Sequence, residues 1–367
     1  MKLKRFMCLS MTLVMVFSLV ACGKAGESST MADSNTESSE NSSIEPTATN
    51  APTATIAPTA TNAPTVTPVP EKAFLTPEVT PKVFMTTDIS PKGLMAAYEA
   101  LDWAPEGNVG VKLSTGEPPA SNYLKPELIK DLVQTLKGTI VECNTAYGGS
   151  RMSTKMHLQV AKDHGFTDIA EVDILDADGS MSLPIEGGSH LKEDLVGSHF
   201  KDYDSYLVLS HFKGHEMAGY GGAIKNISIG FGSSEGKCLI HTAGKSNTSP
   251  WGGDQDDFLE SMAEAGKAVS DSMGNGEKIV YINVMNRISI DCDCNGRPAE
   301  PDIHDIGILA STDPVALDQA CIDLVYAAEN NESLVNRIKF LNGLHTLEHA
   351  EAIGLGYRVY ELVSLDD

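Results

Sequence analysis

The sequence predicts an α/β fold in which a mostly parallel sheet is flanked by helices, with insertions, and is preceded by a disordered tether. Two observations support the folded part of this prediction. From about residue 82, short apolar runs alternate with stretches of helical periodicity. Glycines lie one or two residues after three expected helices, where a left-handed C-cap is favoured: Gly138, Gly165 and Gly343. Strands and helices that alternate at this spacing imply right-handed crossovers and parallel strands covered on both faces.

The expected elements follow one another along residues 82–367, which we interpret as one domain with insertions. The expected strands are Val109–Leu113, Thr139–Glu142, Ala170–Ile174, Tyr206–Ser210, Ile279–Asn283, Ile306–Leu309 and Tyr357–Leu362. The expected helices are Lys92–Leu101, Pro126–Leu136, Thr154–His164, Gln255–Ser272, Pro314–Ala328 and Leu334–Leu341. Asp313 and Pro314 are typical of a helix start, as N-cap and first helical residue. In such folds the site lies in loops beyond the carboxyl ends of the strands.

The first 21 residues have the layout of an export signal. Three positive charges come first: Lys2, Lys4 and Arg5. The apolar stretch at 6–20 is short for a membrane-spanning helix, which needs roughly 20 apolar residues, and is typical of a signal peptide. It ends in Leu19-Val20-Ala21-Cys22-Gly23, which resembles the lipobox of bacterial lipoproteins. We predict a signal peptide at 1–21 and lipid on Cys22 that holds the protein to the extracytoplasmic face of the cell membrane. An ordinary secretory signal with a chance cysteine is the alternative.

Residues 22–81 have the composition of a tether. Serine, asparagine, glutamate and threonine dominate up to about residue 43, and near-repeats of Pro-Thr-Ala-Thr-Asn-Ala follow at 46–51 and 58–63. Such a segment cannot bury enough apolar surface to offset the entropy of ordering, and its prolines favour extended polyproline II. We expect a disordered stalk or a featureless spacer that lifts the domain off the membrane.

Acidic residues dominate the composition. The chain carries 50 acidic against 27 basic residues, a formal net charge of −23. Such a surface repels nucleic acid, so we expect no nucleic-acid partner. It favours cations or cationic partners, although solubility alone explains the charge equally well.

The most distinctive motif is Asp291-Cys292-Asp293-Cys294. In an extended segment, residues two apart face the same way, so the thiols of Cys292 and Cys294 would converge and the two carboxylates would point oppositely. Two convergent thiols are half of a tetrahedral Zn²⁺ site or half of the ligand set of a [4Fe–4S] cluster. A reduced, buried and inert pair is the alternative. The five cysteines of the expected domain are an odd number, which argues against a fully paired disulfide framework: Cys143, Cys238, Cys292, Cys294 and Cys321.

Further thiol and imidazole ligands occur elsewhere. Cys238 and His241 are three residues apart, and His211 and His215 are four apart directly after an expected strand. Because Gly214 lies between these histidines, we expect a loop there rather than a helix. A third pair, His304-Asp305, follows the cysteines. Each histidine taken alone has a hydrogen-bonded structural role as its alternative.

A glycine-rich run predicts an anion site. In Gly221-Gly222-Ala223-Ile224-Lys225-Asn226, backbone amides freed by the glycines can cradle an anion, and Lys225 and Asn226 would contact it. A tight-packing glycine turn is the alternative. The next run, 230–238, fails as a phosphate loop because its first glycine is out of register and Cys238 replaces the Ser/Thr. Asp318, one turn into an expected helix, could face the site. The serine-hydrolase elbow and the His-Glu-x-x-His pair are missing.

Together these segments resemble the DUF362 family. The resemblance rests on His211-Phe212-Lys213-Gly214-His215, on the run at 221–226, on Cys292-Asp293-Cys294, and above all on the stretch from Asp305 to Asp318. It covers roughly residues 82–362. The resemblance implies a protein of unsettled function whose relatives often look like iron–sulfur proteins. Many relatives carry an inserted ferredoxin-like module, but the corresponding place after His241 holds no cysteine here, so any metal must sit in the core motifs.

We therefore expect a cell-surface lipoprotein whose α/β domain binds a metal or an iron–sulfur cluster, with a redox or metal-dependent role. Cys292 and Cys294 would be ligands, and His211, His215, Cys238 and His241 form the reserve for the others. The alternatives are a non-catalytic lipoprotein that captures a solute or wall fragment, and a hydrolase with a mononuclear metal. The substrate and any small-molecule or redox partner stay open.

Overall fold

The computed structural model describes residues 76–366. The predicted signal peptide, Cys22 and the predicted tether up to residue 75 lie outside the described residues. Within the described part of the chain, no helix is long and apolar enough to cross a bilayer.

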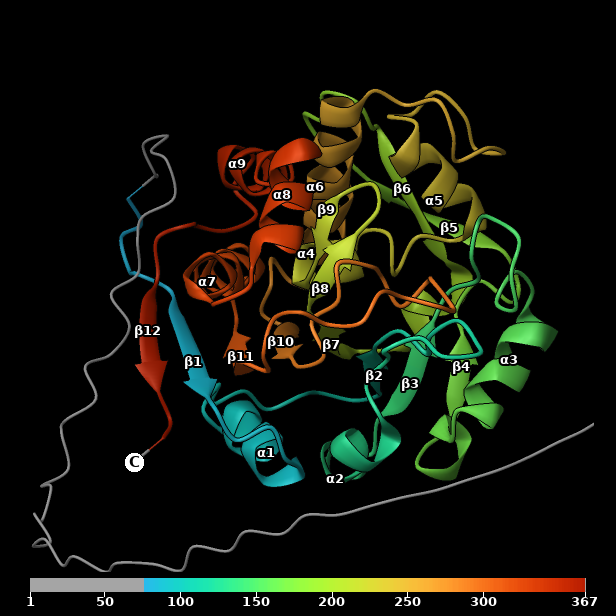
Figure 1. Cartoon of the computed structure of the whole chain (residues 1–367). Helices are drawn as coiled ribbons and strands as arrows, with labels where there is room; N and C mark the ends of the chain where they lie inside the picture. Colours follow the sequence, from blue (N-terminus) through green and yellow to red (C-terminus); the bar gives the residue numbers. More distant parts are fainter. Residues whose placement is uncertain (1–75, 367) are drawn as a thin grey trace, which may run out of the picture. The chain divides into compact units, whose positions relative to one another are not determined.

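An eight-stranded sheet forms the centre of the fold, in the order β12-β1-β11-β10-β7-β2-β3-β4 (Figure 1). Its strands are β1 (Lys82–Thr86), β2 (Val109–Lys112), β3 (Thr139–Glu142), β4 (Val172–Ile174), β7 (Ser205–His211), β10 (Ile279–Met285), β11 (Gly307–Ser311) and β12 (Glu361–Ser364). Only β11 runs antiparallel to its neighbours β1 and β10, and every other pairing is parallel. The predicted mostly parallel sheet is confirmed.

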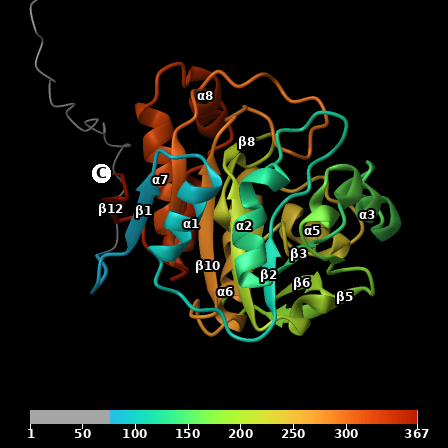
Figure 2. The ribbon, with the colours of Figure 1, turned by 90° about the horizontal axis from the view of Figure 1, so that it is seen from below.

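Helices cover both faces of the sheet. They are α1 (Pro91–Glu99), α2 (Pro126–Leu136), α3 (Thr154–Asp163), α4 (Ala223–Ile227), α5 (Ser234–His241), α6 (Gln255–Ser272), α7 (Pro314–Ala327), α8 (Glu332–Phe340) and α9 (His345–Ala352). One core lies under α1 and α2, which stand in front of the sheet in Figure 2, a second lies under α4, α6 and α7, and a smaller third cluster lies between α5 and α6. Strand residues alternate between the two cores: Leu207 and Leu209 face α1 and α2, whereas Tyr206 and Val208 face the opposite side.

The predicted elements are present, with ends displaced by a few residues. Asp313 is the N-cap of α7 and accepts hydrogen bonds from Val315 N and Ala316 N at 2.8 and 3.0 Å, as predicted. Of the three glycine caps, only Gly165 is left-handed. After α2 and α8 the left-handed residues are Lys137 and Asn342, each one position earlier than predicted. At the ends of these two helices, the residue just before the glycine adopts the left-handed conformation that ends the helix.

Several short elements were not predicted. They are strand β1, the hairpin β5 (Ser180–Pro184) with β6 (Glu193–Gly197), the hairpin β8 (Lys213–His215) with β9 (Gly219–Gly221), the 3₁₀ turns at Phe166–Asp168 and Ser198–Asp202, and helices α4, α5 and α9. The segment after His211, expected as a loop, is strand β8. Strands β8 and β9 have three residues each, too few to show a period of two, so the sequence pattern does not reveal them.

The parallel strands end at one edge of the sheet, and this edge positions the site. Strands β2, β3 and β7 end in polar residues there, at Lys112, Glu142 and His211. Strand β10 ends at Met285 beside them and leads into the loop 286–306, which carries the two cysteines. Site residues from distant parts of the sequence therefore meet beyond the carboxyl ends of the strands, as expected for such sheets.

Candidate functional site

The loop 286–306 (the cysteine loop) lies against strand β8. Gly214 N donates a hydrogen bond to Ser289 O at 2.8 Å. A Cβ on Gly214 would overlap the carbonyl of Ile290. Only glycine allows this close approach of two backbones, and the approach brings the cysteine loop beside His215.

The two cysteines lie in a turn, not in the extended segment that was expected. Asn295 N donates to Cys292 O at 2.9 Å, which closes the turn. The turn sends Asp293 inward, where its carboxylate contacts His211 Nδ1 at 2.9 Å and Lys213 Nζ at 3.2 Å. Burial alone would raise the pKa of Asp293, but these two groups hold it below its ordinary value. Asp293 thus anchors the loop and leaves both thiols on the other side.

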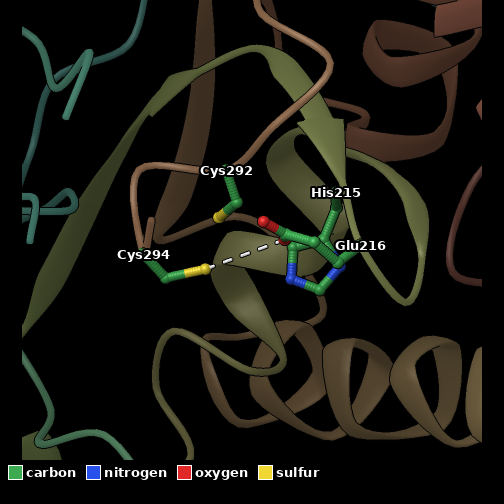
Figure 3. Close-up of side chains that lie close together, drawn as sticks. All are labelled: His215, Glu216, Cys292 and Cys294. Atoms are coloured by element: carbon green, nitrogen blue, oxygen red, sulfur yellow. Dashed lines mark hydrogen bonds between the residues drawn. The ribbon is translucent and has the colours of Figure 1, made fainter. Parts of the chain in front are cut away.

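Four ligand-type side chains meet at this turn (Figure 3). One ligand atom each from His215, Glu216, Cys292 and Cys294 can be chosen so that all lie within 4.8 Å of one another. His215 and Cys292 are buried, Cys294 is half-buried and Glu216 is exposed. The Sγ of Cys294 lies 4.0 Å from Glu216 Oε2. These residues could hold a metal ion.

The two thiols differ in acidity. A hydrogen bond from Cys294, followed by the charge of Lys225 and a hydrogen bond from His215, holds the pKa of Cys292 well below its ordinary range despite burial. The same hydrogen bond, with burial, raises the pKa of Cys294. Lys225 Nζ lies 3.9 Å from Cys292 Sγ. Cys292 therefore loses its proton more readily than Cys294, and the thiolate is the form that binds metals and acts as a nucleophile.

His215 has its ring oriented by the backbone. Its Nδ1 accepts hydrogen bonds from Met217 N at 3.1 Å and Ala218 N at 3.0 Å. Burial and the nearby Lys225 ammonium lower the pKa of His215 to about 4, so the ring is neutral at pH 7. A neutral ring whose Nδ1 is an acceptor carries its proton on Nε2. His215 is thus a donor to the Cys292 sulfur, and Cys292, Cys294 and Glu216 are the groups that offer lone pairs.

The other predicted metal ligands lie elsewhere or are committed to other partners. Both ring nitrogens of His211 face acceptors, Asp293 at 2.9 Å and the Asn286 carbonyl at 2.6 Å. His241 Nδ1 donates to the Lys237 carbonyl at 2.6 Å, and its ring stacks on Phe258. Cys238, on the same helix as His241, lines a separate surface depression. The structure does not bring these side chains into the four-residue group.

The remaining predicted residues, His304, Asp305 and Asp318, lie outside the four-residue group. His304 is exposed, and Asp305 accepts a hydrogen bond from Arg287 N at 2.6 Å in the cysteine loop. Asp318 is fully buried, and its carboxylate accepts from Ala223 N at 2.7 Å and Ile224 N at 3.0 Å. Asp318 therefore caps helix α4 from a distant part of the chain.

The predicted anion-binding residues line a cavity of about 80 Å³ together with both cysteines. Lys225 and Gly221 lie at this cavity, and Gly222 leaves room for the Asp318 carboxylate, which a Cβ would overlap. The side-chain amide of Asn226 is hydrogen-bonded within the protein: Nδ2 donates to Ser210 Oγ and Oδ1 accepts from Lys112 Nζ, both at 3.0 Å. Asn226 shapes the wall of the cavity.

Sequence reasoning missed several side chains of the site: Glu216, Tyr147, Arg151, Lys112, Lys213, Lys237 and Glu142. Burial and the neighbouring Cys294 thiol raise the pKa of the Tyr147 hydroxyl. A signal existed for Lys112 and Glu142, because each is a charged residue at the carboxyl end of an apolar strand. Tyr147 and Arg151 follow β3 in an irregular loop and carried no such signal.

Comparisons with known proteins complete the description. Residues 109–323 match the family model described as "Domain of unknown function (DUF362)". The lactate racemase apoprotein from Thermoanaerobacterium thermosaccharolyticum is similar over 68% of this chain and 57% of its own, at 12% identity and a TM-score of 0.42. A Thermotoga maritima protein is similar over 69% of this chain and 59% of its own, at 12% identity and a TM-score of 0.40. The chain thus spans less than two thirds of each protein. A search of curated proteins gave no match.

Proposed function

The chain belongs to the DUF362 family, and from this premise we propose that its domain binds a thiophilic metal at the cysteine loop, in a redox or metal-dependent role. The convergence of Cys292, Cys294, Glu216 and His215 within 4.8 Å carries the proposal. Two thiols and a carboxylate suit a mononuclear ion such as Zn²⁺ better than a [4Fe–4S] cluster, which takes four cysteines.

Each residue has a part in this proposal. Cys292 loses its proton more readily than Cys294, and both would bind the metal as thiolates. Glu216 would be the third ligand, and His215 would hydrogen-bond the Cys292 sulfur. Three protein ligands leave one coordination position open, which is the pattern of catalytic zinc sites. Because both cysteines line the cavity, that position would be open to a small ligand there. When bound, the metal would supply Lewis-acid or redox chemistry.

Metal analysis of the protein purified without oxygen tests the proposal. We expect about one equivalent of a transition metal, and less than about a tenth of an equivalent after Cys292→Ser or Cys294→Ser. Glu216→Gln should weaken binding by about tenfold, because the thiolates remain. Cys238→Ser, at another buried thiol outside the four-residue group, is the matched control and should retain the metal.

The spectrum identifies the cofactor. A cluster would absorb broadly near about 400 nm and bleach on reduction, whereas zinc leaves the protein colourless. Less than about a tenth of an equivalent in the wild type, with both thiols open to alkylation, would overturn the metal proposal. The cavity with its cationic lining would then favour the second candidate, a non-catalytic protein that captures an anionic solute.

We also propose that the domain acts at the outer face of the cell membrane. The support is sequence alone: the basic start, the apolar stretch at 6–20 and the lipobox-like end at Cys22. In cells given a lipid-labelling probe, Cys22→Ser should abolish incorporation. A mutant that still takes up the label would contradict this location.

A further inference from the structure

Positive charge gathers around the cavity beside the cysteines. Five cationic side chains line it, against a single carboxylate, that of Glu142: Lys112, Arg151, Lys213, Lys225 and Lys237. This concentration occurs in a chain whose formal net charge is −23. The cavity is therefore an electrostatic exception within an acidic protein.

Two of the five cations are already paired. Arg151 bonds to Glu142 at 2.7 Å and to Glu117 at 3.2 Å. Lys213 pairs with Asp293 at 3.2 Å. For the other three, Lys112, Lys225 and Lys237, no carboxylate oxygen of the described residues lies within 4.0 Å.

The ammonium groups of these lysines keep N–H donors that no protein acceptor among the described residues uses. Lys112 Nζ donates to the Leu113 carbonyl at 2.9 Å and to Asn226 Oδ1 at 3.0 Å, both neutral acceptors. Lys237 Nζ donates to the Gly232 carbonyl at 2.5 Å. An ammonium has three N–H groups, so each retains at least one. Burial lowers the pKa of Lys112 to about 8, and the nearby Glu142 carboxylate only partly opposes this shift.

Burying such charges unpaired is costly, and proteins pair them with an anion. Lys225 Nζ lies 3.9 Å from the Cys292 sulfur. Lys112 and Lys237, which are 1% and 6% exposed, make no ion pair within 4.0 Å among the described residues, although the buried carboxylates of Glu142 and Asp194 act on them from farther away. We propose that this cavity binds a small oxyanion with two negative charges, a phosphate or a dicarboxylate, held by Lys112, Lys225 and Lys237.

The size of the cavity limits the ligand. Its volume is about 80 Å³. One water needs roughly 10–15 Å³ by the same measure, so the cavity holds about five to eight non-hydrogen atoms. Inorganic phosphate and malonate fall in this range.

Anion binding goes beyond the proposed metal centre and does not depend on it. The three lysines belong to β2, α4 and α5, whereas the thiols belong to the cysteine loop. If the metal centre is also real, the oxyanion lies beside its open position and defines the class of substrate. The two proposals can therefore fail separately.

Calorimetric titration of the full-length protein with inorganic phosphate and with malonate tests the inference, in the metal-free and metal-loaded states. We expect saturable binding in both states. Lys237→Met should weaken it by about tenfold to a hundredfold, the worth of a charge-assisted hydrogen bond. Lys112→Met is the second variant, in case loss of the Gly232 contact harms folding. Lys245→Met, at a surface lysine paired with Asp254, is the control and should bind as the wild type does.

Each outcome decides one claim. Tighter binding of phosphate than of malonate, or the reverse, identifies the chemistry of the ligand. No heat from either anion in folded, metal-loaded protein would overturn the anion site and leave the metal centre standing. Equal affinity in the wild type and both cavity variants would also overturn it, because the anion would then bind elsewhere. Anion binding by protein that takes up no metal would support the inference and refute the metal centre.

Discussion

Two clusters of ligand-type side chains among the described residues differ in how their polar atoms are used. One is the cysteine cluster: His215, Glu216, Cys292 and Cys294. The other, the histidine cluster, joins α6, α9 and the loop before β6: His190, His345, His349, Glu260 and Glu264. By residue type alone, the histidine cluster is as good a metal site as the first.

In the histidine cluster the two carboxylates are satisfied by their neighbours, whereas His349 makes only longer contacts, with its Nε2 3.6 Å from Glu264 Oε1. Glu260 bonds to His190 at 2.7 Å and to His345 at 2.8 Å. The buried Glu264 carboxylate accepts from three successive backbone N–H groups, with Ser189 N at 2.6 Å and Leu191 N at 2.8 Å at the two ends. These bonds tie three elements of the chain together, so the cluster is a structural link.

In the cysteine cluster, by contrast, the sulfur contacts are long. The thiols lie 3.9 Å from Lys225 and 4.0 Å from Glu216. Apart from the hydrogen bonds that Cys292 accepts from Cys294 and His215, the sulfur contacts are long, whereas both carboxylates of the histidine cluster accept several short hydrogen bonds. Ligand-type residues therefore indicate a metal site only where their lone pairs do not already accept several short hydrogen bonds from neighbouring groups.

The largest expected effect comes from Asp293→Asn, which breaks the support of the cysteine cluster. Removing this carboxylate leaves Lys213 and His211 buried without their anion. Breaking a buried pair in this way costs about 3–5 kcal/mol. Denaturant unfolding should show the loss, and metal content should fall with it. Asp291→Asn, at a less buried carboxylate of the same loop, should cost less than about 1 kcal/mol. Equal losses for the two variants would show that Asp293 does not anchor the loop.

The next effect tests the histidine cluster. Glu264→Gln should destabilise the fold by about 1–3 kcal/mol, because an amide replaces the charged acceptor of three N–H groups. Metal content should not change. Asp271→Asn, on the exposed side of the same helix with an i,i+4 partner in Lys267, should shift stability by less than about 0.5 kcal/mol. If Glu264→Gln removed the metal, the assignment of the two clusters would have to be reversed.

The smallest expected effect is the change in stability as the pH falls. Burial acts to raise the pKa of Glu260 and Glu264, but their histidine and backbone partners hold both below the ordinary value. Their contribution to stability is therefore complete above about pH 4.3, the unfolded value, and is lost as pH falls through the lower folded pKa. Metal release requires only that the thiolates protonate, so it should occur at a higher pH than unfolding. Circular dichroism and metal content, followed over one acid titration, check the order. Simultaneous loss of both would contradict it.

Much of the architecture could be predicted from local sequence. Helix α2 and helix α6 have the bounds that their periodicity and flanking residues predict, and α7 begins where Asp313 and Pro314 mark a cap. The mostly parallel sheet follows from the alternation of strands and helices. These features depend on interactions a few residues apart, which one chain segment contains by itself.

The candidate site was only partly predictable. The Cys292–Cys294 pair and His215 stand out by residue type, but so did Cys238, His241 and His211. Choosing among them required the contact between Gly214 and Ile290, which places β8 against the cysteine loop. The three lysines of the cavity likewise meet only after β2, α4 and α5 have packed around one edge of the sheet.

The sequence by itself determined the fold class, the order of the main elements and the presence of a thiol pair after β10. The tertiary structure decided which imidazole, carboxylate and ammonium groups surround that pair. It also decided which of these groups are already hydrogen-bonded or ion-paired to other parts of the protein. The reason is physical: propensity, capping and periodicity act over a few residues, whereas a lone pair or an unpaired charge is defined by neighbours that only folding brings within about 3–4 Å.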